Sequence, residues 1–445
     1  MLILGQSIET FTAAARVPDD YWWAFGIVCG LGLVWIVVSI VRLVRRRDDK
    51  LLPAGLVWLM MVESLDAAAN PMSWLQMWSA GLGLPLDVVC GVFSGVEALL
   101  WVGGALCVLL FIRNWHRFPP VVLALVALWL CVLFATLGDS LLMTAVLSCL
   151  FVVALGLSPL RRESLALQLT WTLRVLQVAS LVVGVLYPAI GLWAGNPGLF
   201  GVDRLRGVTI HANYLGLVCA LSIVLELTRF KLRSLSLLWL AVGVFCLMWS
   251  SSRGSQLALL VALVFLACWS KPMGRLRWGW LRWALPTVTA AAVCVVSALI
   301  AVTPYEEMDA ITSDRLQVWS AVWPHLWDYP WLGRGQLPNP MTDPVIAQFL
   351  PYPVAHCHNQ WLQSTLESGG LGLAALVAVF ACCVWAIVRS GKHRRLALAL
   401  FAVVAVTSLE EVYLSLSLRG TAYALVVAVV IIGTPTVAPK RLVEA

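Results

Sequence analysis

Residues 355–395 read AHCHNQWLQSTLESGGLGLAALVAVFACCVWAIVRSGKHRR, a stretch whose character changes twice. Its polar beginning is followed by an uncharged apolar run over residues 370–388, and then by a basic cluster from Arg389 to Arg395. An apolar run of about 20 residues can cross the hydrocarbon core of a bilayer as a helix. Because Lys and Arg gather on the cytoplasmic side, the stretch predicts a transmembrane helix whose basic end is inside and whose polar end is outside.

The rest of the chain has the same apolar character. Of its 445 residues, 61% are hydrophobic and 12% are charged, with a mean hydropathy of +0.89. Soluble domains have about 25% charged residues, so the composition excludes a soluble globular protein. We expect an all-α fold, a polytopic membrane helix bundle of about 13 (12 to 14) transmembrane helices that forms one integral membrane domain over residues 1–445. The predicted spans are 21–41, 51–68, 86–112, 119–137, 139–158, 168–192, 210–228, 234–250, 254–270, 283–303, 370–388, 395–413 and 419–434.

Basic residues fall into two groups when these spans alternate across the membrane. The larger group lies in short loops on one face, which the positive-inside rule makes cytoplasmic. This placement accounts for the net charge of +7 without a nucleic-acid partner. The external group contains no Lys and consists of Arg16, Arg204, Arg206, Arg253, Arg315, Arg334 and Arg419. A planar guanidinium binds phosphate oxygens in pairs, so this set favours an anion site; chance is the alternative, because the chain has few Lys.

The longest segment between spans is the external loop 304–369, which we expect to carry function because long ordered loops commonly do. Within it, SDRLQVWSAVWPHLW (313–327) predicts an amphipathic helix that begins from a capping Ser, and HNQWLQSTLESGG (358–370) predicts a helix that ends at Gly. Most of the 23 Trp fit interfacial belts, with sugar-stacking platforms as the second interpretation.

Three polar stretches stand at the outer mouths of spans: 204–216 (RLRGVTIHANYLG), 250–255 (SSSRGS) and 355–372. Ionisable groups at such places are usually functional or paired with one another. Arg206 and Arg253 could clamp a diphosphate, although an interfacial or ion-paired Arg is the alternative for each.

Histidines are the candidates for proton transfer and for metal binding. His358, beside Asn359, could act as a general base near neutral pH. His211 could either cap a helix or contact a ligand. The pair His356 and His358 could bind a metal, but no carboxylate cluster follows it, so we expect neither a metal nor another cofactor. The twelve Cys fall almost entirely within apolar spans and indicate neither a disulfide framework nor a zinc site.

One combination of these residues resembles a known signature. His358-Asn359, nine intervening residues and then Gly369-Gly-Leu-Gly372 is similar to the H-N-x9-G-x-x-G motif in the outer loop of the O-antigen ligase superfamily. The stretches 204–216, 250–254 and 313–335 also resemble segments of that superfamily, in the same order along the chain.

The resemblance implies a metal-independent, inverting glycosyltransferase in the bacterial inner membrane, with its active site facing the periplasm. The donor would be a glycan on undecaprenyl diphosphate, and the acceptor would be lipid A core or another glycan. His358 would take the acceptor's proton, with Asn359 or a loop carboxylate orienting its ring, and Gly369 and Gly372 would be the motif glycines. The groups expected to bind the donor diphosphate are Arg204, Arg206, His211, Arg253, Arg315 and Arg334.

Two other functions remain open from the sequence. A Wzy-type polysaccharide polymerase would use the same donor chemistry with a different acceptor. A transporter or flippase, from another class, would need repeats and ionisable residues at the membrane midplane. Glu97 is the one carboxylate that we place well inside a span, and Glu410 and Glu411 lie near an outer end, where pairing with Arg419 is the simpler interpretation.

Overall fold

The computed structural model describes Val34 and residues 119–135, 162–199, 201–209, 211–229, 234–268, 315–335, 340–350, 354, 356–390, 394–414 and 422–433. Most of these residues are helical, as the sequence predicts. The helices are α6 (Pro120–Ala135), α8 (Arg162–Leu186), α9 (Pro188–Gly191), α10 (Ala212–Arg229), α11 (Ser234–Ser250), α12 (Arg253–Cys268), α16 (Arg315–Val322), α17 (Pro344–Ala347), α18 (Gln360–Arg389), α19 (Arg394–Glu410) and α20 (Ala422–Gly433), with 3-10 turns η3 (Trp323–His325) and η4 (Pro340–Thr342). The predicted spans at 21–41, 51–68, 86–112, 139–158 and 283–303, together with Glu97, Arg16 and Arg419, lie outside the described residues.

Two of the described helices are long and apolar enough to cross a membrane, namely Leu165–Leu186 of α8 and Gln360–Arg389 of α18. Shorter apolar helices occupy the other predicted spans within the described residues. α8 also exposes Val175, Val178, Val182 and Val185 along one face. An apolar stripe at helical spacing that no other described element covers is what a lipid-facing helix shows.

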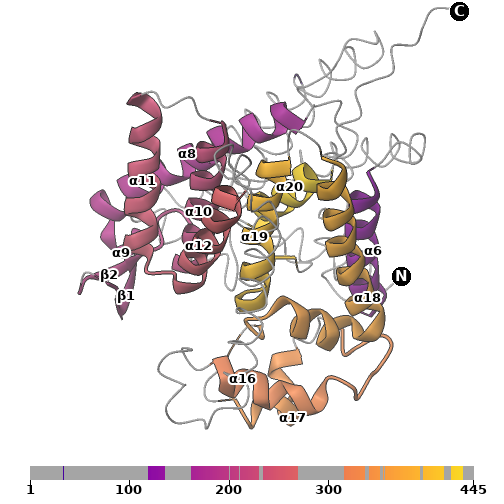
Figure 1. Cartoon of the computed structure of the whole chain (residues 1–445). Coiled ribbons are helices and arrows are strands. Elements are labelled where there is room, and N and C mark those ends of the chain that lie inside the picture. The colour runs from indigo at the N-terminus through magenta and orange to yellow at the C-terminus, as the bar shows by residue number, and fades with distance from the viewer. Residues whose placement is uncertain are drawn as a thin grey trace, which may run out of the picture.

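The central helices form one apolar core. α20 is buried on every side from Ala424 to Ile432, because its sequence is apolar all round and can only be satisfied among other helices. It packs with α6, α8, α18 and α19, while α12 lies along α19 (Figure 1). A buried ion pair ties α8 to α10: Arg174 Nε donates to Glu226 Oε1 at 2.6 Å, and its guanidinium lies against the rings of Trp171 and Trp239.

A small β-hairpin interrupts the helical fold, which the sequence did not predict. β1 (Leu192–Pro197) pairs antiparallel with β2 (Asp203–Leu205), with Leu192 opposite Leu205. The predicted span 168–192 therefore ends earlier, at Leu186, because Pro188 starts a new turn. The carbonyl of Gly191 accepts from the N–H groups of Arg206 and Gly207, at 2.9 Å each, which returns the chain toward α8.

α18 changes direction at Gly369 rather than ending there, which corrects the prediction of a helix that stops at Gly. Gly369 has φ 59° and ψ −151°, which is not helical, yet helical residues continue on both sides of it. Only a residue without a side chain takes this conformation readily. In Figure 1, α18 first crosses the lower end of the bundle, near α16 and α17, and then rises beside α6.

The two ends of the helix bundle differ in the residues that they carry. α10 and α18 begin, and α19 finishes, close to the polar stretches that contain His211, His358 and Glu411. The opposite ends carry Arg229 on α10, Arg389 on α18 and Arg394 on α19. The polar residues singled out in the sequence thus gather at one end of the bundle, away from these basic residues.

Candidate functional site

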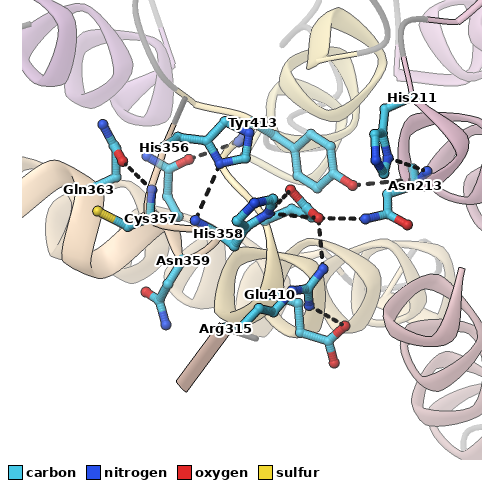
Figure 2. Close-up of polar contacts among 12 residues, drawn as sticks. His211, Asn213, Arg315, His356, Cys357, His358, Asn359, Gln363, Glu410 and Tyr413 are labelled. Carbon is cyan, nitrogen blue, oxygen red and sulfur yellow. Dashed lines mark hydrogen bonds and ion pairs between the residues drawn. The ribbon is translucent and has the colours of Figure 1, made fainter. Parts of the chain in front are cut away.

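Glu411, which directly follows α19, is the hub of the polar cluster. Side chains from three other segments contact its carboxylate, and Figure 2 shows these partners, His358, Arg315 and Asn213. His358 Nδ1 lies 3.3 Å from both carboxylate oxygens, and Arg315 Nη2 donates to Oε1 at 2.8 Å. Asn213 Nδ2 donates to the same oxygen at 2.6 Å. Arg315 also lies 3.6 Å from the Glu410 carboxylate, so one guanidinium bridges two adjacent acids.

These partners keep Glu411 ionised although its side chain is only 7% exposed. Burial acts to raise the pKa of this carboxyl, but the nearby His358 and Arg315 act more strongly in the other direction. Its pKa therefore lies well below the usual range. A carboxylate that is buried, charged and in contact with a histidine can orient that histidine and stabilise its protonated form.

His358 is held in an unusual backbone conformation. Its φ is +50°, a region that non-glycine residues rarely occupy and that clusters at functional sites. The backbone N–H of His358 donates to His356 Nδ1 at 3.2 Å, and the next residue, Asn359, is the N-cap of α18. The Asn359 side chain accepts from Trp361 N and Leu362 N and donates to the Leu409 carbonyl. Asn359 thus holds the helix end, while Glu411 and the His356 ring contact the His358 ring.

Two buried glutamines on the first turn of α18 bind the backbone next to His358 and next to Glu411. Gln360 Oε1 accepts from Tyr413 N at 3.0 Å and Leu414 N at 2.7 Å, just after Glu411. Gln363 Oε1 accepts from Cys357 N at 2.8 Å, just before His358. Because the two glutamines are three positions apart, they lie on one face of the helix. One helical turn therefore sets the distance between the two chain segments that carry His358 and Glu411.

Arg204 joins the cluster from β2. Its Nη2 donates to Asn213 Oδ1 at 2.7 Å and its Nε donates to the Ser250 carbonyl at 2.8 Å. Burial lowers the pKa of this guanidinium, and the positive charges of Arg315 and Arg253 lower it further, against the opposing effect of Glu411. The charges of Arg204 and Arg253 thus affect each other, although the two residues lie in different segments. Arg204 contacts the Ser250 carbonyl, which is 46 positions further along the chain.

His211 and Arg206 stand next to this group. His211 Nδ1 accepts from Asn213 N at 3.0 Å, which is the helix-capping arrangement considered from the sequence. Its ring packs edge-on against Trp193, with centroids 4.3 Å apart, and the Arg206 guanidinium lies 5.7 Å from the centre of the same Trp193 ring. Burial lowers the pKa of His211 to about 4, so its imidazole is neutral at neutral pH.

A small open cavity lies among these elements. Its lining residues are Asn213, Ser252, Gly254, Ser255, Arg315, Thr407, Glu410, Glu411 and Tyr413. Gly254 follows Arg253 at the start of α12, and a side chain there would collide with the Glu410 carboxyl group. The glycine therefore lets α12 approach the end of α19 at the cavity wall.

Arg334 lies apart from the Glu411 cluster. Its guanidinium pairs with Asp328 at 2.5 Å and with Asp343, and its backbone N–H donates to the Leu366 carbonyl at 2.8 Å. These bonds fasten the loop to α18 just before the Gly369 kink. Arg334 is one of the six groups expected to bind diphosphate, and its partners Asp328, Asp343, Tyr329 and Leu366 all belong to the loop and α18.

His356, His358 and Glu411 could together hold a metal ion, since one ligand atom from each lies within 4.8 Å of the others. The sequence argument against a metal depended on the lack of a nearby carboxylate, and it missed Glu411 because that residue is 53 positions from His358. Arg315 and Asn213 already bind this carboxylate, however, and Arg204 is next to it. Guanidinium groups so close oppose a divalent cation and favour an anion.

The chain also resembles known proteins over one continuous stretch. Residues 235–377 match the family model described as O-antigen ligase. This match supports the O-antigen ligase superfamily for the part of the chain that it covers. A comparison with curated proteins gave no match.

The O-antigen ligase match runs from α11 into α18 and includes Arg253, Arg315, His358 and Gly369. Glu411 lies beyond the matched residues and joins the site through the packing of α19. Proteins of this superfamily are membrane-embedded and are transferases of the ligase or polymerase type, acting on lipid-linked glycans and their acceptors. The expected family is thus confirmed.

Proposed function

We propose that the chain transfers a glycan from undecaprenyl diphosphate to an acceptor hydroxyl on the periplasmic side of the bacterial inner membrane. The acceptor that we favour is lipid A core, which would make the chain an O-antigen ligase. The observation that carries this proposal is the contact of His358 with Glu411 inside a cluster that also holds Arg315. It combines a base, a group that orients the base, and a cation for the leaving diphosphate.

The reaction forms one bond and breaks one. The acceptor oxygen attacks the anomeric carbon from the side opposite the diphosphate, so the carbon–oxygen bond to the diphosphate breaks and the configuration inverts. Glu411 faces His358 Nδ1, which leaves Nε2 to take the acceptor's proton. Arg315 and Arg204 lie where they can stabilise the negative charge left on the diphosphate.

The position of basic residues at one set of helix ends supports an orientation in which the cluster faces the periplasm. Arg229, Arg389 and Arg394 are all at the helix ends opposite the cluster. By the positive-inside rule those ends are cytoplasmic, and the cluster then faces the periplasm. Undecaprenyl diphosphate would reach it from the lipid with its charged group at the level of Arg315.

We also propose that the reaction needs no metal, and the charges near Glu411 support this. Because the Arg315 guanidinium binds Glu411 and Arg204 is linked to it through Asn213, we expect glycan transfer to survive EDTA and to gain nothing from Mg²⁺ or Mn²⁺. The measurement is product formation by the purified chain after exhaustive chelation. Loss of transfer in EDTA, with recovery on adding one divalent ion, would instead assign a metal to His356, His358 and Glu411.

The decisive experiment separates binding from turnover in the reconstituted chain with purified lipid-linked glycan. His358→Ala should lower turnover by roughly 10²–10⁴-fold, the usual contribution of a general base, and leave donor affinity nearly unchanged. His325→Ala is the matched control, since His325 pairs with Asp328 in the loop, and it should keep both properties. Equal loss of donor affinity and turnover in His358→Ala would contradict the assignment of a base.

The acceptor is tested in the same assay. With lipid A core present, a ligase attaches the donor glycan to the core and does nothing with the donor alone. A polymerase would instead join donor molecules to one another and give a ladder of longer lipid-linked glycans without lipid A core. That ladder would replace the ligase proposal with the polymerase alternative.

A further inference from the structure

Large apolar side chains are exposed between α16 and the loop end at Gly333. We call Trp323, Trp327, Tyr329, Trp331 and Leu332 the aromatic surface; each is at least half exposed, and Trp331 is 71% exposed. A group of exposed aromatic residues this dense usually contacts something else. Trp and Tyr combine a large apolar ring with one polar atom, which suits the boundary between lipid and water.

Backbone hydrogen bonds place this surface at one end of the α18 span. The carbonyl of Pro330 accepts from Gly370 N at 2.7 Å, and that of Trp331 accepts from Leu371 N at 3.3 Å. Gly370 and Leu371 are the first residues of the apolar part of α18. A side chain on Gly369 would lie 2.5 Å from the carbonyl carbon of Trp331, so the two segments touch directly.

The length of the span sets the depth of Trp331. From Gly370 to Arg389, α18 covers about 30 Å at 1.5 Å per residue, which is the thickness of the hydrocarbon core. At the Arg389 end, the guanidinium lies 4.2 Å from the centre of the Trp385 ring, as expected for an anchor at one interface. Trp331, at the Gly370 end, then lies at the other interface.

The exposed apolar face of α18 continues onto the aromatic surface. Leu371, Val377, Val384 and Val388 are all exposed along the span, and Leu371 bonds to Trp331 through its backbone. The lipid that covers this face of α18 would meet Trp331 and Leu332 without a break.

We propose that the aromatic surface is embedded in the periplasmic leaflet of the bilayer and fixes the depth of α16, an inference that rests on the membrane orientation proposed above. α16 runs from Arg315 to Val322, and the first residue after it is Trp323. Eight helical residues span about 12 Å, so an anchor at Trp323 holds Arg315 within a short distance of the headgroups. That is the level at which the diphosphate of a membrane-bound carrier lies.

Photocrosslinking tests the inference in the full chain, reconstituted in vesicles of phosphatidylethanolamine and phosphatidylglycerol. We would introduce p-benzoylphenylalanine at position 331 or 327, irradiate, and identify adducts by mass spectrometry. Lipid adducts are expected at both positions. Position 345 is the matched control, because Val345 is exposed on α17, which Figure 1 shows below α16 at the lower end of the molecule, and it should give no lipid adduct.

Each other outcome overturns the inference. Adducts at 331 and 327 with added glycan acceptor, but not with lipid, would make the surface a sugar platform. Lipid labelling at 331 no stronger than at 345 would remove the anchor. Position 385 tests the membrane placement of α18 separately, since it should label with lipid at the other interface. Turnover of His358→Ala reports on the proposed reaction alone, so the two failures are distinguishable.

Discussion

Glu411 contacts both the proposed base, His358, and a cation, Arg315. If its main role is to orient His358, then Glu411→Gln should lose a large part of the roughly 10²–10⁴-fold contributed by general-base catalysis. Because the two residues act as a unit, the double variant with His358→Ala should be no slower than His358→Ala alone. Turnover of the four proteins checks this. Additive losses would mean that Glu411 acts mainly through Arg315.

Arg315 and Arg334 form a natural pair for comparison, since each arginine has two acidic partners. Arg315→Lys should weaken donor binding by at least about tenfold, because an ammonium cannot reproduce the paired hydrogen bonds of a guanidinium to a diphosphate. Arg334→Lys should leave donor affinity unchanged and lower thermal stability slightly. Donor affinity and melting temperature are the two measurements. A larger affinity loss in Arg334→Lys would move the donor site toward Asp328.

At the residue scale, the sequence predicted several of the groups that the structure brings together, but not all of their partners. Arg204, Arg315 and His358 were all expected at the site, and their contacts with Asn213 and Glu411 bring them together. The contact of Glu411 with the His358 ring was not predicted, because Glu411 follows a different helix and no local pattern links the two. The place of Glu411 and its neighbour at an outer helix end was the one available signal.

At the scale of elements, the kink of α18 invites a test with adjacent glycines. Gly369→Ala should destabilise the protein by about 1–3 kcal/mol, because its φ is positive and the new Cβ would meet the Trp331 backbone. Gly370→Ala should cost much less, because this position has a helical conformation and the nearest atom, Pro330 O, lies 3.1 Å away. Thermal unfolding in detergent measures both. Equal losses would mean that the kink itself is not needed.

Hydrophobic runs predicted the helices well and the breaks in them poorly. α10, α11, α12 and α19 begin within two residues of their predicted spans, because a run of apolar residues in lipid has to satisfy its backbone as a helix. The sequence did not predict the hairpin β1–β2, because its strands are short and do not alternate between apolar and polar residues. The sequence predicted a helix end at Gly369 instead of a kink, because a glycine after a polar helix is expected at both.

For the whole molecule, two partly buried histidines, His211 and His356, predict how stability varies with pH. Burial lowers the pKa of His211 and of His356 to about 4, from an ordinary value near 6.5. Between these values the unfolded chain binds more protons than the folded chain, so stability falls as the pH drops from about 6.5 to 4. The melting temperature in detergent should decline across this window.

Asn offers a matched substitution at both positions. Each histidine accepts, through Nδ1, the N–H of the residue two places later, which Asn side chains also do. His211→Asn and His356→Asn should therefore keep the local bond and flatten the decline of melting temperature between pH 6.5 and 4. An unchanged slope in both variants would show that other groups cause the acid sensitivity.

The apolar part of α18 has fixed neighbours at both ends: the Trp331 carbonyl at Leu371, and Trp385 stacked on Arg389. A helix anchored at only one end can tilt or slide when the bilayer becomes thicker or thinner. On the proposed membrane placement, with both ends occupied, a change in bilayer thickness would be transmitted to the loop that leads back to Arg315. We therefore expect turnover of the proposed reaction to vary with the acyl length of the surrounding lipid.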